Sequence, residues 1–266
     1  MYRILQLLGG WLLVVALAVS AAAEHGYALR RRAAYESILA RDLKRHIFVL
    51  ADDTYEGREA GSRGGYAAGN YLAREFARIG LKPAGEQGSY FQAFGAGYRN
   101  ILGLMPGSDP QLADEVIVVG AHYDHVGYGT SQNSFGPTGY IHNGADDNAS
   151  GTAALLELAE ALAEMGPPRR SILFALWDAE EKGLLGSRHW VAYPTVPLNK
   201  VRLMVNMDMV GRLRDNRLEI SGSRTSWGLR SLVARHNDQG LEIDFTWAIE
   251  DNSDHYPFFA RSIAYL

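Results

Sequence analysis

Side chains that can bind a metal ion or move a proton gather at five places along the chain. Each place follows an apolar run or lies in the loop beyond one. The residues are His122 and Asp124, Asp146 and Asp147, Glu180 and Glu181, Asp208, and His255. In open α/β sheets, ligand sites assemble at the carboxyl ends of the strands. These residues are therefore expected to converge on one edge of a sheet.

The residue types favour a zinc centre over other metal sites. The chain has no cysteine, which excludes thiolate zinc sites, iron–sulfur clusters and a cysteine nucleophile. Two histidines with several carboxylates suit a pair of zinc ions. Magnesium would instead prefer oxygen ligands and retained water.

Each group also has a simpler explanation when it is considered alone. The segment 146–150 could cap the helix that follows it, and Glu180 with Glu181 could be a solvated surface pair. Asp208 fits such an explanation least, because it is flanked by Met207 and Met209 and a buried carboxylate is costly unless it is paired or metal-bound. All of the simpler explanations would have to hold together, so the pattern favours a metal site.

Alternating strands and helices are expected to position these side chains. Apolar runs predict strands at 101–105, 115–121, 171–177 and 200–210, with a last one at 262–266. Helical periodicity and caps predict helices at 33–50, 66–79, 152–165, 183–193 and 226–237. Runs such as EVIVVGA and SILFALW show no alternation, which is typical of strands buried on both faces. The expected fold is a three-layer α/β/α sandwich with a mixed, largely parallel central sheet.

Composition narrows the class of protein. The 266 residues carry 26 basic and 30 acidic side chains, a net charge of −4, and 47% are hydrophobic. This balance is typical of a globular protein and gives no broad basic field for nucleic acid. No repeat or low-complexity linker divides the chain, so residues 24–266 are expected to form one domain.

The first 23 residues have the composition of a secretory signal peptide. Arg3 precedes an apolar run from Ile4 to Val19, and small residues follow up to Ala23. Cleavage after Ala23 would give an exported protein, periplasmic or secreted, without a stable membrane anchor. The alternative is an uncleaved anchor, since 4–23 is just long enough to span a bilayer.

Five segments together resemble the co-catalytic di-zinc aminopeptidase family, which also includes glutamate carboxypeptidase-type exopeptidases and glutaminyl cyclases. The segments are GAHYDH, NGADDNASG, WDAEEKGLLGS, NMDMVG and SDHYPF. The resemblance runs from about residue 47, where FVLADDTYEGREAGSRG is similar to the family's entry segment, to the C-terminus. It implies two zinc ions and peptide substrates.

The resemblance also implies a role for each matched residue. His122 and Asp208 would bind one zinc ion, and Glu181 and His255 the other. Asp146 would bridge both ions. Glu180 would be the catalytic general base, and Asp124 would orient the imidazole of His122. His125 and His142 flank these segments, but their spacing does not require them to bind metal.

The resulting hypothesis is an exported di-zinc exopeptidase that removes residues from peptide N-termini. Glu250, Asp251 and Asp254 before His255 could bind a substrate amine, whereas Arg212 and Arg214 could bind a carboxylate; we favour the amine. The alternatives are a glutaminyl cyclase-like enzyme, which uses one zinc ion, and a truncated, catalytically silent binding protein. The hypothesis of a truncated protein arises because only eleven residues follow His255. The peptidase domain is therefore expected to lack the last strand and helix of the family.

Overall fold

The computed structural model describes residues 26–134 and 136–266. The predicted signal peptide, residues 1–23, lies outside these ranges. Within the described ranges, no helix is long and apolar enough to cross a membrane.

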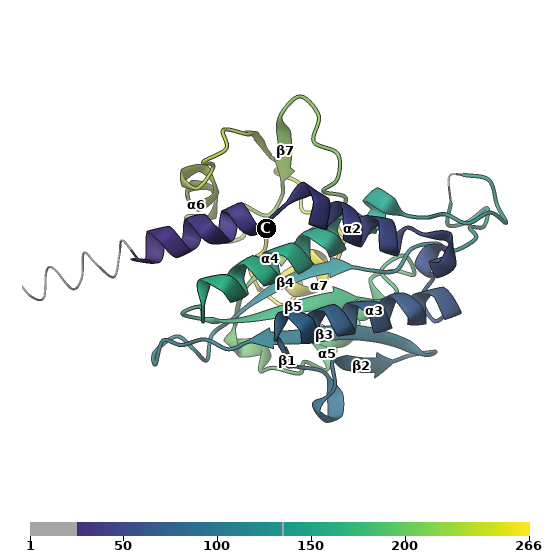
Figure 1. Ribbon diagram of the computed structural model, residues 1–266, viewed down its shortest axis with the longest axis horizontal. Coiled ribbons are helices and arrows are strands. Elements are labelled where there is room, and N and C mark those ends of the chain that lie inside the picture. The colour runs from purple at the N-terminus through teal and green to yellow at the C-terminus, as the bar shows by residue number, and fades with distance from the viewer. Residues whose placement is uncertain (1–25, 135) are drawn as a thin grey trace, which may run out of the picture.

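A six-stranded mixed sheet forms the centre of the fold (Figure 1). Its strands are β1 (Lys82–Pro83), β2 (Phe91–Phe94), β3 (Tyr98–Met105), β4 (Val116–His122), β5 (Ser171–Trp177) and β6 (Val201–Asn206). The order is β1-β3-β5-β4-β6, with β2 also paired to β3. Strands β5, β4 and β6 are mutually parallel, whereas β1, β2 and β3 pair antiparallel. The expected mixed sheet is confirmed, and its parallel half carries the polar residues at its carboxyl ends.

Helices cover both faces of this sheet. Helices α2 (Ala40–Leu50), α3 (Arg63–Ile79) and α4 (Gly151–Met165) lie on the face toward the viewer in Figure 1. Helices α5 (Leu185–Ala192) and α7 (His255–Phe259) pack on the other face. The short helices η1 (Asp53–Arg58), η2 (Glu86–Gly88), η3 (Ala145–Ser150) and η4 (Leu198–Lys200) connect these elements. This arrangement confirms the three-layer sandwich.

Strand β5 shows why the apolar runs lack alternation. All seven of its residues are buried, because β3 and β4 flank it and helices cover both of its faces. Phe174 and Leu176 join the core under α2, α3 and α4. Leu173 and Trp177 point the other way and pack with residues of α5 and α7. Successive side chains of a strand point to opposite faces, so both sets must be apolar.

A smaller unit follows β6. Strands β7 (Arg217–Ile220) and β8 (Glu242–Phe245) form a two-stranded parallel sheet, and α6 (Leu229–Arg235) lies between them in the chain. Figure 1 shows β7 and α6 projecting beyond one edge of the main sheet. The sequence prediction contained the helix but neither strand.

The predicted helix 33–50 is divided in the structure. A helix covers residues 26–37, Ile38 and Leu39 are non-helical, and α2 begins at Ala40. Ser37 Oγ donates a hydrogen bond of 2.8 Å to Ala34 O, so this hydroxyl competes with the helical hydrogen-bond pattern. Of the residues of α2, His46 and Leu50 are buried.

The predicted strand 262–266 lies beside β6. Met204 N donates to Ala264 O and Leu266 N donates to Met204 O, both at 2.9 Å. The assigned pairing is limited to one parallel bridge between Met204 and Tyr265.

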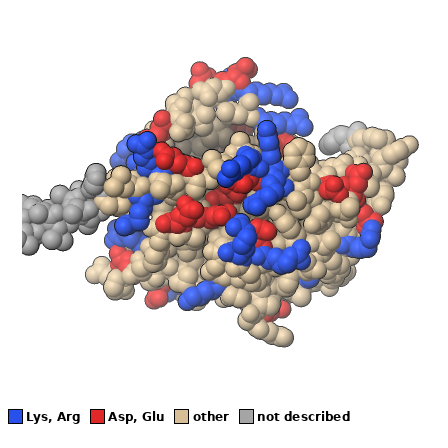
Figure 2. Space-filling view, in the orientation of Figure 1, with Lys and Arg blue, Asp and Glu red and all other residues tan. Residues whose placement is uncertain are grey.

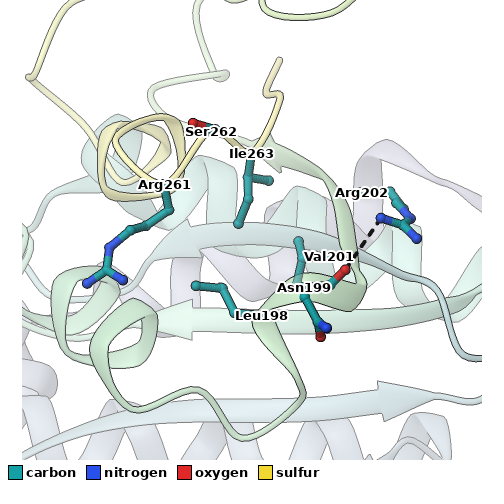
Figure 3. Close-up of a pocket in the computed structure, with 7 residues that line it drawn as sticks. All are labelled: Leu198, Asn199, Val201, Arg202, Arg261, Ser262 and Ile263. Atoms are coloured by element: carbon teal, nitrogen blue, oxygen red, sulfur yellow. Dashed lines mark hydrogen bonds between the residues drawn. The ribbon is translucent and has the colours of Figure 1, made fainter.

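A surface cavity lies at the amino end of β6 (Figure 3). Its volume is about 490 Å³, and its lining is Leu198, Asn199, Val201, Arg202, Arg261, Ser262 and Ile263. Val201 begins β6, whereas Asp208 follows the other end of that strand. This cavity is therefore separate from the polar residues at the carboxyl ends.

On the face shown in Figure 2, basic and acidic side chains are interspersed.

Candidate metal centre

The predicted site residues lie at the carboxyl ends of three neighbouring parallel strands. His122 is the last residue of β4, Glu180 and Glu181 follow β5, and Asp208 follows β6. Because β4 lies between β5 and β6, side chains from either side can reach His122.

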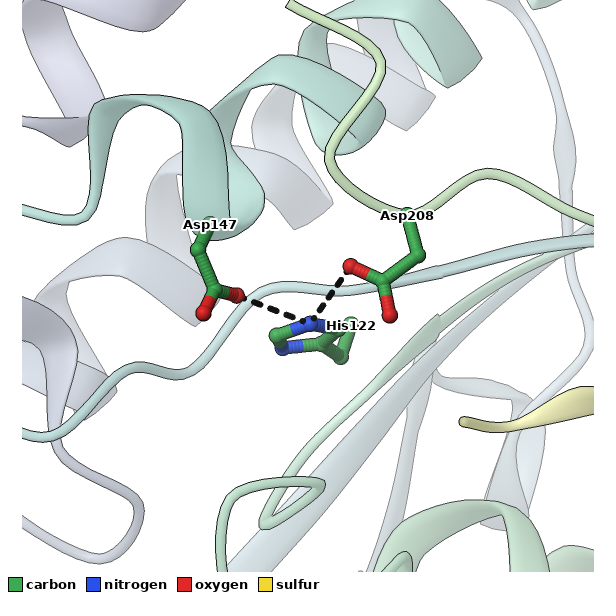
Figure 4. Close-up of side chains that lie close together, drawn as sticks. All are labelled: His122, Asp147 and Asp208. Atoms are coloured by element: carbon green, nitrogen blue, oxygen red, sulfur yellow. Dashed lines mark hydrogen bonds and ion pairs between the residues drawn. The ribbon is translucent and has the colours of Figure 1, made fainter. Parts of the chain in front are cut away.

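The first cluster is centred on His122, whose side chain is buried. Its Nε2 atom lies 3.3 Å from Oδ1 of Asp147 and 3.3 Å from Oδ1 of Asp208. Figure 4 shows the two carboxylates approaching the same ring nitrogen from opposite sides. Glu180 Oε2 lies slightly farther away, 3.9 Å from the same nitrogen.

The second cluster joins His125 to Glu181. His125 Nδ1 lies 2.7 Å from Glu181 Oε1 and 4.0 Å from Oδ2 of Asp147. Asp147 is thus common to both clusters, with one carboxylate oxygen toward each histidine. Sequence reasoning left His125 out, and the spacing of the motif gave no signal for it.

The structure places Asp147 in these clusters, whereas Asp146, the predicted bridging residue, lies outside them. Asp146 Oδ1 accepts a hydrogen bond of 3.0 Å from Gly211 N, and its Oδ2 lies 2.8 Å from Arg212 Nε. The backbone is extended at Asp147 (φ −101°, ψ 101°). Neighbouring side chains in extended backbone point to opposite sides, so the two aspartates diverge.

Asp124 holds the segment that carries the two glutamates. Its side chain is fully buried; Oδ1 accepts from Glu180 N at 3.0 Å and Oδ2 from Glu181 N at 3.4 Å. Its Oδ1 also lies 3.7 Å from His122 Nδ1, but the backbone oxygen of Asp124 is closer to that nitrogen, at 3.2 Å. The carboxylate therefore accepts from the amides of both glutamates, and the backbone oxygen of Asp124 is the nearer partner of the imidazole.

His255 lies outside both clusters. Its Nε2 is 2.9 Å from Glu250 O, and its ring stacks on Tyr265 with centroids 4.3 Å apart. The same loop nevertheless reaches the first cluster, because Ser253 Oγ donates to Asp208 Oδ2 at 2.7 Å.

The side chain of Glu180 is partly buried and has several other carboxylates near it. Burial raises the pKa of Glu180 to about 9; the positive charge of His122 opposes the shift, while the carboxylates of Asp254, Asp124 and Asp208 add to it. Burial would lower the pKa of His122, but hydrogen bonds to nearby aspartates outweigh it and the pKa is raised well above its usual value. A bound cation would relieve the repulsion among these carboxylates.

The donor set fits zinc. Each cluster offers an imidazole nitrogen and two carboxylate oxygens, all within 4.8 Å of one another. Histidine nitrogens with carboxylate oxygens are the usual ligands of catalytic zinc. One carboxylate that belongs to both sets suits two neighbouring ions.

Comparisons with known proteins identify the family of this chain. The sequence profile of "Peptidase family M28" matches residues 100–266. An aminopeptidase of Pseudomonas aeruginosa is 32% identical over 168 residues, which cover 57% of this chain and 28% of that protein. The chain spans about a third of the length of the curated relatives it matches.

Solved structures show the same fold. The LapA aminopeptidase of Legionella pneumophila superposes with a TM-score of 0.66 at 22% identity, over 88% of this chain and 62% of that one. A glutaminyl cyclase of Porphyromonas gingivalis superposes with a TM-score of 0.66 at 21% identity, over 86% and 83% of the two chains.

Proposed function

Because this chain belongs to peptidase family M28, we propose that it is a zinc-dependent aminopeptidase that releases residues from the N-termini of peptides. The observation that carries this proposal is the pair of histidine–carboxylate clusters that share Asp147. Relatives named aminopeptidase support the choice among exopeptidases.

In this proposal the residues that would hold two zinc ions come from the ends of β4, β5 and β6, from η3 and from the start of α7. His122 and Asp208 would hold one ion, Glu181 and His255 would hold the other, and Asp147, in place of Asp146, would be the ligand common to both. Since His255 lies outside the second cluster, its Nε2 would have to turn away from Glu250 O, and His125 would remain the partner of Glu181. The ions would supply Lewis acidity toward the scissile carbonyl and activate the attacking water.

Glu180 is the proposed general base. Its Oε2 atom lies 3.9 Å from His122 Nε2, so it faces the same space as the ligands without belonging to either cluster. Its carboxylate would accept a proton from the attacking water and then donate it to the leaving amine. Asp124 keeps Glu180 in place through the hydrogen bond from Glu180 N.

Recognition of an amine is favoured over recognition of a carboxylate. Arg212 is paired with Asp146, which leaves it less available to a substrate carboxylate. Asp254 is buried and accepts from Ser187 Oγ at 2.5 Å, so Glu250 and Asp251 are the remaining acidic candidates, and both are exposed. Peptides are the proposed partners. On the face shown in Figure 2, basic side chains are interspersed with acidic ones, so this face presents no continuous basic surface for nucleic acid.

We further propose export, because the predicted signal peptide at residues 1–23 would direct the chain to the periplasm or the medium. N-terminal sequencing of the protein from the producing cells tests this: a mature chain beginning at Glu24 supports it. A chain retaining residues 1–23 in the membrane fraction contradicts it.

The function is tested on zinc-loaded protein with three substrate types: aminoacyl anilides with a free amine, the same compounds N-acetylated, and peptides with N-terminal glutamine. We expect hydrolysis of the free-amine compounds alone, and about 10²–10⁴-fold less with Glu180→Gln, the range for a general base. Zinc content of the variant is the control. Cyclisation of glutamine without hydrolysis would indicate a glutaminyl cyclase, and no reaction would favour a silent binding protein.

A further inference from the structure

Arg58 is a buried cation close to the candidate metal centre. It is the last residue of η1, and its side chain has 0% exposure. Among the described residues, the acceptors of its hydrogen bonds are backbone carbonyls. The carboxylates of Asp124, Asp147 and Glu181 attract it electrostatically. Burial of an arginine is costly unless its N–H groups are satisfied.

Backbone carbonyls satisfy this guanidinium. Nε donates to Tyr123 O at 2.9 Å, Nη1 to Leu50 O at 2.7 Å and to Asn143 O at 2.6 Å, and Nη2 to Gly144 O at 2.8 Å. One side chain thus joins the end of α2, the end of β4 and the loop that enters η3. The planar fork of arginine can contact several acceptors at fixed angles, which a lysine ammonium on its flexible stem cannot do.

The joined segments carry the metal-facing residues. Tyr123 lies between His122 and Asp124, and Gly144 precedes Asp147 by three residues. The backbone of η1 adds to the connection, because His125 N donates to Arg58 O at 3.3 Å. Arg58 therefore sets the spacing between the β4 end and the Asp147 loop.

The backbone at Arg58 has a conformation that is uncommon for a residue with a Cβ. Its φ is +49°, in the left-handed region that residues with a Cβ occupy at a cost. Strain of this kind persists where surrounding contacts over-determine the conformation, and the four hydrogen bonds provide such contacts.

We propose that Arg58 is a positioning residue that preorganises the two clusters for zinc by fixing the Asp147 loop against the end of β4. The inference rests on the proposed function only in taking zinc as the metal.

The first test measures zinc affinity, by competition with a chromophoric chelator, for Arg58→Lys. Val116→Ala is the matched control, because Val116 is buried at the opposite end of β4 from His122. We expect Arg58→Lys to bind zinc about 10- to 100-fold more weakly, the range for residues that orient ligands, and to lower kcat more than it changes KM. Val116→Ala should lose thermal stability but keep the wild-type zinc affinity.

The second test uses Arg58→Ala with added methylguanidinium, and with methylammonium as the control cation. Methylguanidinium should restore zinc affinity, because it reproduces the fork, and methylammonium should not. Wild-type affinity in Arg58→Lys, or an equal loss of affinity in Val116→Ala, overturns the proposal. It is also overturned if neither arginine variant folds, because Arg58 would then serve the fold as a whole.

The zinc measurement separates this inference from the proposed function. A wild-type protein that binds zinc but does not hydrolyse aminoacyl substrates contradicts the function and still allows the Arg58 comparison. An active enzyme in which Arg58→Lys binds zinc normally contradicts only the inference.

Discussion

Oδ1 of Asp147 lies 3.3 Å from Nε2 of His122, and the other oxygen of the same carboxylate faces His125 at 4.0 Å. The carboxylate of Asp147 thus lies next to a histidine of each cluster. Its neighbour Asp146 has a different function in the structure, since it accepts from Gly211 N and pairs with Arg212.

Asp147→Asn should therefore remove metal binding, whereas Asp146→Asn should not. Loss of a shared ligand weakens both positions, so we expect less than one zinc ion per chain and more than about 100-fold lower activity, beyond the range for an orienting residue. Asp146→Asn is a matched control of the same chemistry one residue away. Elemental analysis of both variants measures the difference. Retention of two zinc ions in Asp147→Asn would show that Asp147 is not the shared ligand.

His125 and His255 should have separable effects on the second zinc position. His125 Nδ1 lies at hydrogen-bond distance from Glu181 Oε1, the arrangement of a residue that orients a ligating carboxylate. We expect His125→Ala to keep two zinc ions at about 10- to 100-fold lower affinity for the weaker one. His255→Ala should lose one ion outright. If His125→Ala loses an ion and His255→Ala keeps both, His125 is the ligand at the second position.

The strands and helices that position the site could be predicted because they are buried, and buried elements consist mainly of apolar residues. Strand β5 was predicted with its observed bounds, Ser171–Trp177, and α4 begins one residue from its predicted start. The short strands β1 and β2 were missed. They contain two and four residues, and strands so short show no periodicity to detect.

The sequence did not predict which way the side chains in the loops of the site point. The sequence placed both aspartates of the Asp146–Asp147 pair near the metal, and only the local backbone decides which one faces it. The resemblance placed His255 at the centre, while in the structure its ring stacks on Tyr265 and its Nε2 faces Glu250 O. The direction of Asp147 depends on its local backbone dihedral angles, and that of His255 on contacts with Tyr265 and Glu250. Composition and spacing encode neither.

Asp124→Asn should reduce catalysis through the position of Glu180. Each carboxylate oxygen of Asp124 accepts from a backbone N–H, one of Glu180 and one of Glu181. An asparagine amide would present an NH₂ group to one of these donors. We expect kcat to fall about 10- to 100-fold, as for other residues that orient a site, with a smaller change in KM.

Asp109→Asn is the matched control for this substitution. Asp109 also accepts from a backbone N–H, that of Gln111 at 2.9 Å, and it pairs with Arg169 on the surface. Steady-state kinetics and zinc content of both variants are compared. A normal kcat in Asp124→Asn with two zinc ions bound would mean that the loop of Glu180 is held by other contacts.

The metal-free protein should lose stability as the pH rises from 6 to 9. Burial raises the pKa of Glu180 to about 9 and that of Asp254 to about 7. At pH 6 these groups hold protons in the folded state, whereas carboxyls of the unfolded chain, with pKa values near 4, have lost them. The pKa of His122 is also raised by its aspartate partners. All three groups therefore bind more protons when folded, so the free energy of unfolding falls with rising pH.

Zinc should remove most of this dependence, because the cations replace the protons that the clustered carboxylates otherwise retain. Urea unfolding of chelator-treated protein at several pH values between 6 and 9, repeated with saturating zinc, measures both slopes. Metal-free Glu180→Gln should show a shallower slope than the metal-free wild type, because the amide cannot titrate. A metal-free wild type that is equally stable at pH 6 and pH 9 would show that the buried carboxyls ionise without cost, and would contradict the charge distribution described for this site.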